Sequence, residues 1–366
     1  MEERLKEAKQ LTASIKADSI TIVPGEYYQR SKLFTYFFGE KNRALWTVPL
    51  TVKVFNYDSA GLQPFEIGGS QQTISIRLRD SLKREWTLRS VNKDQRNVLP
   101  GILRPTFLRS MFRDQVAAMN PFAPLITADL AKSAGLPVLH PTMYWVPHVE
   151  KHSKYNERMA GRVVYLEEHL NESWKGDTAF FSLLDAMDTD DMFERTEKEK
   201  TPLDTFLYLK TRLFDMLIND WDRHEDQWRW VLVSDSTSKK FIPIAKDRDN
   251  AFYVFDEGVI SDIVLWFNNK FQSYRKDFED IEGLAHQSKK LDKKILGKLA
   301  QYKFVQAANE LQQQLSTAEI HDAFMNYPSD VYKKVGEQHK AILQSRLSQL
   351  SNAAKEFHKL ISKDQD

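Results

Sequence analysis

The stretch that decides the fold is Leu203-Asp-Thr-Phe-Leu-Tyr-Leu-Lys-Thr-Arg-Leu-Phe-Asp-Met-Leu-Ile218, which runs directly into Asn219-Asp-Trp-Asp-Arg-His224. Its apolar residues recur with a period near 3.6, which predicts a helix with one buried face. Thr201 suits the N-cap of this helix and Pro202 its first turn, because a proline there gives up no hydrogen bond. A buried helix is therefore expected to lead into a loop rich in aspartate.

The residues after this loop predict a hairpin that ends in a second acidic segment. Trp228 to Val233 and Phe241 to Ala245 are short apolar runs joined by the polar turn Ser234-Asp-Ser-Thr-Ser-Lys-Lys240. The second run leads into Lys246-Asp-Arg-Asp249. Helix, acidic loop, hairpin and acidic segment thus follow one another along the chain.

The first half of the chain has the pattern of a sheet with one helical excursion. The stretch Gln72–Arg79 shows the clearest alternation of apolar and polar residues, and the other expected strands are rich in residues that favour strands. The expected strands are Trp46–Phe55, Gln72–Arg79, Glu85–Val91, Thr142–Pro147 and Arg162–Leu166, and the expected helices are Pro105–Met119 and Leu125–Ala134. The first three strands predict a small antiparallel sheet.

From about Val259 onward the pattern is helical to the end of the chain. Ser316-Thr-Ala-Glu319 has the form of a capping box. The last helix has a coiled-coil-like apolar spacing, which indicates a helix packed on its own domain or, alternatively, a dimer seam. Asp190 to Lys200 is rich in charge and is expected to be a solvated loop. The apolar residues of the last helix are Leu343, Leu347, Leu350, Ala354, Phe357 and Ile361.

The composition of the chain excludes several classes of function. The 366 residues include 52 Lys and Arg against 51 Asp and Glu, a net charge of +1, so no overall field favours nucleic acid or an anionic membrane. There is no cysteine, which excludes disulfides, thiolate catalysis and cysteine-ligated metals. No stretch approaches the roughly 20 apolar residues of a membrane helix. We expect a soluble chain, either complete or a fragment of a larger protein.

The two acidic segments contain the residue types that phosphoryl transfer requires. One carboxylate must position the attacking hydroxyl, and a second carboxylate with an amide ligand must hold magnesium against the nucleotide phosphates. Kinases place the first on a loop after a core helix, with an amide five residues later, and the second after the following hairpin. Here Asp222 takes the first role, Gln227 and Asp247 bind the metal, and Asp249 supports it. ATP and Mg²⁺ are the cofactors that this pattern implies.

A phosphate site is expected upstream. Gly68-Gly69-Ser70-Gln-Gln-Thr73 precedes an alternating strand, and such a turn leaves N–H groups and hydroxyls free for phosphate oxygens, although an ordinary hairpin also explains it. Arg89 and Lys93 are the alternatives for the cation that holds the phosphates. Asp114 is a candidate partner for that cation, or else forms a surface salt bridge.

The acidic loop also admits other interpretations. Asp220, Asp222, His224 and Asp226 alternate and would hold a metal for hydrolysis if they lay on a strand, whereas the preceding helix predicts a loop. The aspartates also suit the plain role of capping a turn. A calcium loop is disfavoured, because Glu225 stands where glycine is required. In the phosphoryl-transfer interpretation His224 supports the loop and does not ionise in catalysis.

Two parts of this pattern resemble known loops. Asn219-x-x-Asp222-Arg-His224 followed by Asp247-x-x-x-Ala251-Phe252 resembles the catalytic and metal-binding loops of atypical kinases, namely type II phosphatidylinositol 4-kinases, HipA-type toxin kinases and spore-coat CotH kinases. The resemblance covers about residues 68 to 255 and implies a two-lobed, protein-kinase-like α+β fold. The chain departs from the kinase pattern at Gln227, where asparagine is expected, and at Arg89, where lysine is expected. The resemblance therefore implies the fold more directly than the activity.

A second resemblance covers most of the chain. Four segments look like a region of large Bacteroidetes surface proteins that lies between a calcineurin-like metallophosphoesterase domain and an outer-membrane barrel. They are Gly68–Arg79, Leu88–Asp94, Tyr165–Glu168 and Asp220–Trp230. This resemblance implies a fragment exposed to the periplasm or the cell surface, with the neighbouring phosphoesterase domain or barrel as a partner. Otherwise the chain is expected to be cytoplasmic.

We therefore expect a helical extension over residues 1–40, a sheet-rich N-terminal lobe over 41–170 and a helical C-terminal lobe over 171–366. The expected function is ATP- and magnesium-dependent phosphoryl transfer to an acceptor of unknown class. The alternatives are a pseudokinase or accessory domain that binds a nucleotide or a partner, and a metal-dependent hydrolase. Neither a nucleic-acid partner nor a membrane span is expected.

Overall fold

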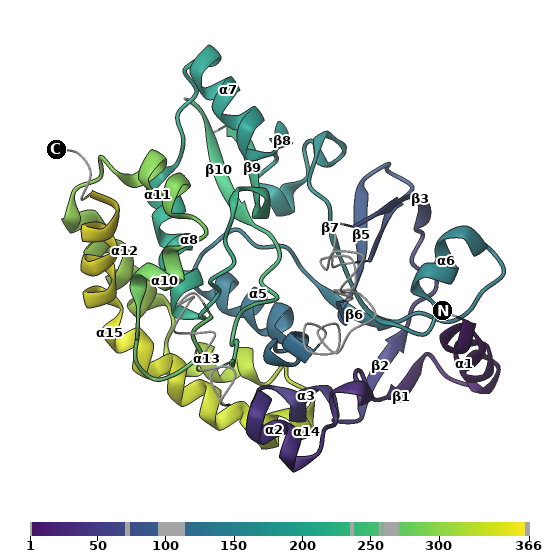
Figure 1. The fold of residues 1–366 in the computed structure, drawn as a ribbon. Helices are drawn as coiled ribbons and strands as arrows, with labels where there is room; N and C mark the ends of the chain where they lie inside the picture. Colours follow the sequence, from purple (N-terminus) through teal and green to yellow (C-terminus); the bar gives the residue numbers. More distant parts are fainter. Residues whose placement is uncertain are drawn as a thin grey trace, which may run out of the picture. The chain divides into compact units, whose positions relative to one another are not determined.

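The computed structural model describes residues 2–69, 74–93, 114–234, 238–255, 258 and 271–362 (Figure 1). The chain divides into two compact units, each assembled from several segments. Unit 1 is rich in sheet and unit 2 is mainly helical, so the chain has the expected α+β class, and the order of its elements is consistent with a kinase-like fold. Within the described ranges, no helix is both long enough and apolar enough to cross a bilayer. Unit 1 comprises Met1–Arg30, Arg43–Pro121 and His140–Ser173, and unit 2 comprises Ser31–Asn42, Phe122–Leu139 and Trp174–Asp366.

A mixed sheet forms the body of unit 1, with seven strands among the described residues. Neighbouring strands are antiparallel except β2 and β6, which run parallel. The register of β5 matters for the candidate site, because it places Arg89 between Tyr165 and Ser75 on the neighbouring strands. In spatial order the strands are β1 (Ser19–Ile22), β2 (Leu50–Val54), β6 (Thr142–Trp145), β7 (Val163–Glu168), β5 (Glu85–Ser90), β4 (Ser75–Arg79) and β3 (Gln63–Gly68).

Alternation along β4 explains its place in the sheet. Ile76 and Leu78 are fully buried beside Leu88 of β5, in a core that includes Phe55 and Val164. A shift of one residue in register would expose both β4 side chains, and burying each one contributes about 1.5–3 kcal/mol. The described helices of unit 1 are α1 (Glu2–Ser14), α3 (Arg43–Trp46) and α6 (Ser153–Met159).

Several expectations for unit 1 need correction. Residues 1–40 are not helical throughout, because β1 pairs with β2 and adds a strand to the sheet. The strand expected from Trp46 begins at Leu50, because α3 is a helical turn. The sheet is mixed and not antiparallel throughout. The helix expected over Pro105–Met119 lies largely outside the described residues, and its last part is the 3₁₀ turn Gln115–Ala118.

Unit 2 contains the predicted hairpin. β9 (Trp228–Ser234) and β10 (Lys239–Ala245) pair antiparallel, and β8 (Asp185–Met187) lies on the other side of β9. The pairing brings Gln227, which precedes β9, level with Lys246, which follows β10, and the Lys246 amide donates to the Gln227 carbonyl (2.9 Å). The hairpin therefore places the second acidic segment beside the end of the acidic loop.

The charged stretch Asp190–Lys200 forms a helix and not the solvated loop that its composition suggested. Asp188 caps this helix, α7 (Thr189–Glu199), by accepting from the Asp191 amide (3.0 Å), and charged side chains pair one turn apart along it. The remaining helices of unit 2 are α2 (Lys32–Phe38), α5 (Ala123–Ser133), α8 (Thr205–Leu217), α10 (Ile281–Ala285), α11 (Lys289–Leu296), α12 (Gln301–Gln314), α13 (Thr317–Phe324), α14 (Ser329–Val331) and α15 (Glu337–Ser362).

The helix predicted before the acidic loop is α8, and its second half is completely buried. It begins at Thr205 with Asp204 as its N-cap, whose side chain accepts from the first turn (2.9 Å). The start expected at Thr201 is therefore wrong by about one turn. The reason is a tertiary contact, because Leu203 forms a bridge to Phe241 of β10 and keeps the preceding chain extended.

The C-terminal helix α15 packs within unit 2, against α12 and α8. Leu343, Leu350 and Phe357 are fully buried there, which confirms the expectation of a helix packed on its own domain. The capping box is also confirmed, since Ser316 accepts from the Glu319 amide (3.3 Å) and the Glu319 carboxylate accepts from the Ser316 amide (2.8 Å). The dimer alternative loses its basis, because these apolar side chains are already covered.

Arg346 of α15 fixes the end of α8. Its buried guanidinium donates to the main-chain oxygens of Leu217 (2.9 Å) and Met216 (2.6 Å), and the Met216 oxygen also accepts from the Asn219 amide (3.1 Å). It also reaches the main-chain oxygens of Arg275 (3.3 Å) and Asp277 (3.1 Å). Burial lowers the pKa of Arg346 to about 10, so the side chain is still a cation at neutral pH. The C-terminal helix thereby holds the point where the acidic loop begins.

Arg346→Met is expected to lower the free energy of unfolding by about 2–4 kcal/mol, because methionine removes the donor to the buried Leu217 carbonyl and leaves that of Met216 with main-chain amide donors alone. Urea denaturation followed by circular dichroism measures this. Arg275→Met is the control, since that arginine is 53% exposed and its loss should change stability by no more than about 0.5 kcal/mol. Equal effects of the two substitutions would contradict the assigned role.

Candidate functional site

The acidic loop starts with a sharp change of direction. Asn219 adopts a left-handed conformation (φ 63°), and its side chain donates to the main-chain oxygen of Gln272 (2.9 Å). The Asp220 amide donates to the carbonyl of Asp215 (2.8 Å). A 3₁₀ turn, Glu225–Gln227, ends the loop immediately before β9. The loop is therefore fixed at its start by these hydrogen bonds and at its end by the hairpin.

Asp222 lies in the middle of this loop, and its carboxylate contacts the segment after the hairpin. Asn250 donates to Oδ2 (3.2 Å), and Gln287, two residues before α11, reaches Oδ1 (3.5 Å). An ionised carboxylate has about four acceptor positions, so two amide donors orient it without occupying all of them. The Asp222 carboxylate is thus oriented by two hydrogen bonds and can still accept a further one.

Arg223 joins the loop to the end of the hairpin. Its Nη1 donates to the carbonyl oxygens of Gln227 (3.2 Å) and Lys246, and its Nη2 donates to the Asp220 carboxylate (2.7 Å). Its Nε donates to Asp215 of α8 (3.0 Å). Because Arg223 is fully buried, these bonds are shielded from water and the three segments are held tightly.

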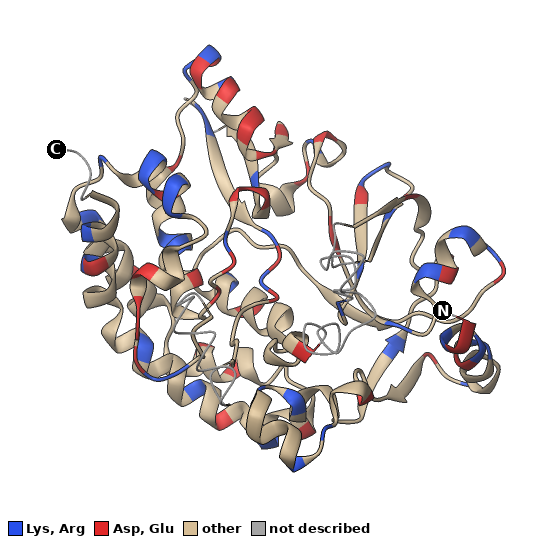
Figure 2. Cartoon of the chain, in the orientation of Figure 1, with Lys and Arg blue, Asp and Glu red and all other residues tan. Residues whose placement is uncertain are grey.

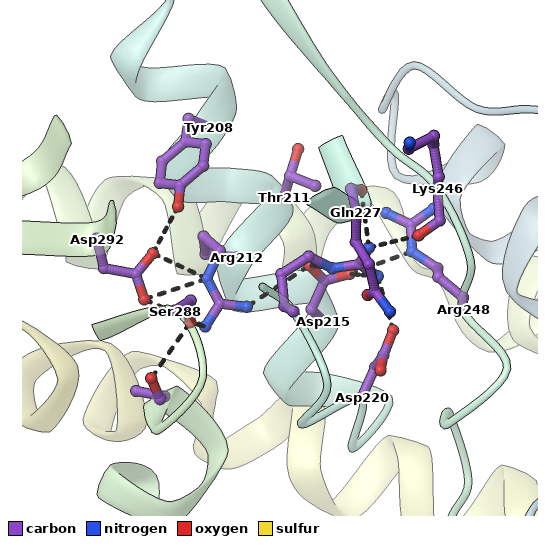
Figure 3. A network of polar contacts seen from close by, with 12 residues as sticks. Tyr208, Thr211, Arg212, Asp215, Asp220, Gln227, Lys246, Arg248, Ser288 and Asp292 are labelled. Atoms are coloured by element: carbon purple, nitrogen blue, oxygen red, sulfur yellow. Dashed lines mark hydrogen bonds and ion pairs between the residues drawn. The ribbon is translucent and has the colours of Figure 1, made fainter. Parts of the chain in front are cut away.

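Asp215 stands near the centre of the polar network in Figure 3. Besides Arg223, its carboxylate binds Arg248 (3.1 Å) from the segment after β10 and lies 3.6 Å from Arg212 of its own helix. Arg212 continues the network to Asp292 of α11 (3.0 Å). Burying a charge is costly unless it is paired, and here each arginine contacts at least one carboxylate. The network has three arginines (Arg212, Arg223, Arg248) and three aspartates (Asp215, Asp220, Asp292), all buried.

Asp247 has a backbone conformation that few aspartates adopt. Its φ of 50° lies in the left-handed region, where a residue other than glycine persists when the surrounding structure holds it. The carbonyl of Lys246, on one side, accepts from Arg223, and the side chain of Arg248, on the other side, binds Asp215. The segment that carries Asp247 is therefore anchored immediately before and after this residue.

The donor set suits magnesium. The Gln227 side chain is buried, and its Oε1 accepts no hydrogen bond from the described part of the chain. Such an orphaned oxygen costs about 1–3 kcal/mol, which a bound cation would offset. Asp247 is partly buried and Asp249 is buried. An amide oxygen and carboxylates are hard oxygen ligands of the kind that Mg²⁺ prefers. The residues present therefore fit this ion.

The alternating cluster expected for a hydrolase does not assemble. The Asp220 carboxylate is buried against Arg223, whereas the side chains of His224 and Asp226 are 42% and 95% exposed. Among the residues that the structure describes, no three acidic or histidine side chains form a metal-binding group. The hydrolase alternative is therefore not supported.

The cations expected upstream both lie in unit 1 and are buried. Arg89 forms an ion pair with Glu167 of β7, with 2.8 Å between Nε and Oε1, and Lys93 lies just beyond the end of β5. Asp114, considered as a partner for either cation or as a surface residue, is fully buried and binds Arg43 of α3 through both oxygens (2.6 and 2.5 Å). The expectation of a surface salt bridge is therefore wrong, because this carboxylate is buried in unit 1.

The glycine turn is only partly described. Gly68 ends β3, and Gly69 has a φ of 115°, a conformation that L side chains rarely adopt. Ser70 lies outside the described residues, as do residues 71–73. The phosphate-binding role of this turn stays a prediction.

Sequence reasoning missed the residues that support the loop. Asp215 and Arg212 lie among the buried positions of α8, and a charged residue at such a position rarely lacks a partner, which was a usable signal. No sequence signal pointed to Asn250 and Gln287, because their contact with Asp222 depends on how distant segments fold together.

Comparison with known proteins gives likenesses to solved structures only, and the one described below is distant. No protein-family model matches the chain, and no curated protein matches it significantly. Among solved structures, the chain is similar to the crystal structure of a Helicobacter pylori proinflammatory kinase, CtkA, with 12% sequence identity and a TM-score of 0.37. The match covers 83% of this chain and 97% of that chain. A likeness this distant assigns no function.

The charge state of Asp220 makes stability depend on pH. Burial raises the pKa of Asp220 from 3.8 to about 7; Arg223 opposes this, whereas Asp215 and Asp222 add to it. The folded chain therefore binds this proton more tightly than the unfolded chain does. Its contribution to the free energy of unfolding is complete below about pH 4 and is lost as the pH rises toward 7.

Asp220→Asn is expected to remove this contribution, because asparagine does not titrate. The difference in the free energy of unfolding between the original chain and Asp220→Asn should decrease as the pH rises from about 4 to 7 and stay level above it. Urea denaturation at several pH values measures the difference. Asp226→Asn, at a side chain that is 95% exposed, serves as the control and should show no such trend. A difference that does not vary with pH would show that Asp220 is ionised throughout.

Proposed function

We propose that the chain is a kinase-like phosphotransferase that moves a phosphoryl group from ATP to an acceptor hydroxyl, with magnesium as cofactor. The observation that carries this proposal is the joining of the two acidic segments. Asn250 binds Asp222, and Arg223 binds the carbonyls that precede the hairpin and follow it. These contacts hold together the segments that carry the proposed hydroxyl-orienting and metal-binding carboxylates, and this supports phosphoryl transfer as the function.

Each residue has a distinct role in this proposal. Asp222 orients the acceptor hydroxyl and accepts its proton, while Asn250 and Gln287 hold the carboxylate in place. Gln227 and Asp247 would hold magnesium, with Asp249 supporting them. When bound, the ion would neutralise charge on the nucleotide phosphates. Two carboxylates, one amide and the phosphates themselves would complete its oxygen ligands.

Binding of the nucleotide phosphates also calls for cations and N–H donors. Arg89, which binds Glu167 in a buried pair, and Lys93 stay the alternatives for the cation. The turn at Gly68 and Gly69 would supply main-chain N–H groups. The acceptor, whether protein, lipid, sugar or small molecule, is not specified by these residues.

A second candidate function is nucleotide binding without transfer, as in a pseudokinase or an accessory domain of a metallophosphoesterase. It is favoured by Arg89, which stands where kinases have lysine and is neutralised by Glu167. In this case the acidic cluster would bind magnesium and nucleotide, and Asp222 would have no acceptor to orient.

Thermal unfolding with ligands tests the proposal. A ligand that binds only the folded state adds about 2.7 kcal/mol at about 100 times its Kd. For a chain of this size the melting temperature should rise by a few degrees. Magnesium with ATP should stabilise the original chain, and Asp247→Asn should lose this response. Asp222→Asn should keep it while the rate of phosphate transfer falls roughly 10²–10⁴-fold.

The control variant for these ligand-binding and transfer measurements is Asp226→Asn. Asp226→Asn changes an exposed carboxylate outside the cluster, so it should keep both the binding and the transfer. Binding without transfer in the original chain would favour the second candidate. No change of melting temperature with any combination of magnesium, manganese, ATP and GTP would rule out the nucleotide site.

A further inference from the structure

We propose that Asp215 is a positioning residue that sets the places of the two magnesium ligands Gln227 and Asp247. This inference rests on the proposed function and deepens it. Asp215 lies on α8, outside the acidic loop and outside the segment after the hairpin, yet its side chain is bound to both.

The first connection runs through Arg223 to Gln227. Asp215 Oδ2 accepts from Arg223 Nε (3.0 Å), which holds the guanidinium in one orientation. The Nη1 of the same group then donates to the carbonyls of Gln227 (3.2 Å) and Lys246. The Gln227 carbonyl accepts a second bond from the Lys246 amide (2.9 Å), so the backbone that carries the amide ligand has little freedom to move.

The second connection runs through Arg248 to Asp247. Asp215 Oδ1 accepts from Arg248 Nε (3.1 Å), and Arg248 is the residue directly after Asp247. On the other side of Asp247, the Lys246 carbonyl is held by the first connection. The left-handed backbone of Asp247 (φ 50°) is therefore fixed from both sides, and both anchors lead back to one carboxylate.

Asp215 thus binds both arginines that hold the two ligand-bearing segments, whereas Asp220 binds only Arg223 of these two among the described residues. Residues that orient metal ligands through such contacts typically change metal affinity 10–100-fold when they are mutated. A purely structural aspartate would instead lower the stability and leave the affinity of the folded protein unchanged. The two roles can be separated, because the chain contains a matched aspartate.

That matched residue is Asp292. Like Asp215 it is fully buried and binds Arg212 (3.0 Å), and it also accepts from the Tyr208 hydroxyl (2.7 Å). In the described part of the chain, it forms no hydrogen bond or ion pair with Arg223 or Arg248. Asp292→Asn therefore removes a buried charge from the same network without releasing either connection.

The experiment measures Mn²⁺ affinity by electron paramagnetic resonance, in the presence of a non-hydrolysable ATP analogue, for the original chain, Asp215→Asn and Asp292→Asn. Circular dichroism checks the fold of each. We expect Asp215→Asn to bind Mn²⁺ 10–100-fold more weakly, and Asp292→Asn to bind it within about twofold of the original chain although its melting temperature also falls. If Asp215→Asn does not fold, Arg248→Gln takes its place, since it releases only the second connection and should weaken binding in the same direction.

The results separate this inference from the proposed function. Unchanged affinity in a folded Asp215→Asn, or equal losses in Asp215→Asn and Asp292→Asn, would overturn the positioning role while leaving the magnesium site in place. Absence of Mn²⁺ and nucleotide binding in the original chain would overturn the proposed function, and this inference with it.

Discussion

The contact on which the rest of unit 2 depends is the binding of arginines by the buried carboxylate of Asp215. An unpaired charge at this depth would cost several kcal/mol, so the aspartate and its arginines are stable there only together. Arg223 comes from the acidic loop and Arg248 from the segment after the hairpin. Packing the charges of this network into one interior therefore forces α8, the loop and the hairpin into a single arrangement.

This constraint explains why the loop has a defined shape although most of its residues are polar. Arg346 of the C-terminal helix secures the end of α8, and the carbonyls bound by Arg223 secure the hairpin. Between these anchors lies Asp222, oriented by two amides from outside the loop. The polar interior thus has a cost in desolvation, and it fixes the acidic loop and the segment after the hairpin relative to α8.

The sequence was sufficient to predict those features that depend on residues close together in the chain. The buried period of α8, the hairpin and the capping box at Ser316 depend on local patterns, and the structure contains all three. The spacing from Asp222 to Gln227 and on to the end of the hairpin was readable for the same reason. Local patterns did not predict features that depend on contacts between distant residues. Leu203 forms a bridge to β10, so α8 starts later than its sequence indicated. Asn42 belongs to unit 2, where it binds the carbonyl of Phe252, although it precedes most of the sheet of unit 1 in the sequence. A charged residue on α8 indicated that Asp215 has a partner, but its role in joining two segments could not be predicted, because it depends on arginines that are distant in the sequence.

The measurement that tests this account most directly is a crystal structure of the chain with magnesium and a non-hydrolysable ATP analogue. The account predicts Mg²⁺ at about 2.0–2.1 Å from Gln227 Oε1 and from the Asp247 carboxylate, with Asp215 still bound to Arg223 and Arg248. A metal bound away from both of these ligands, or a nucleotide complex in which Asp215 has released the two arginines, would contradict it.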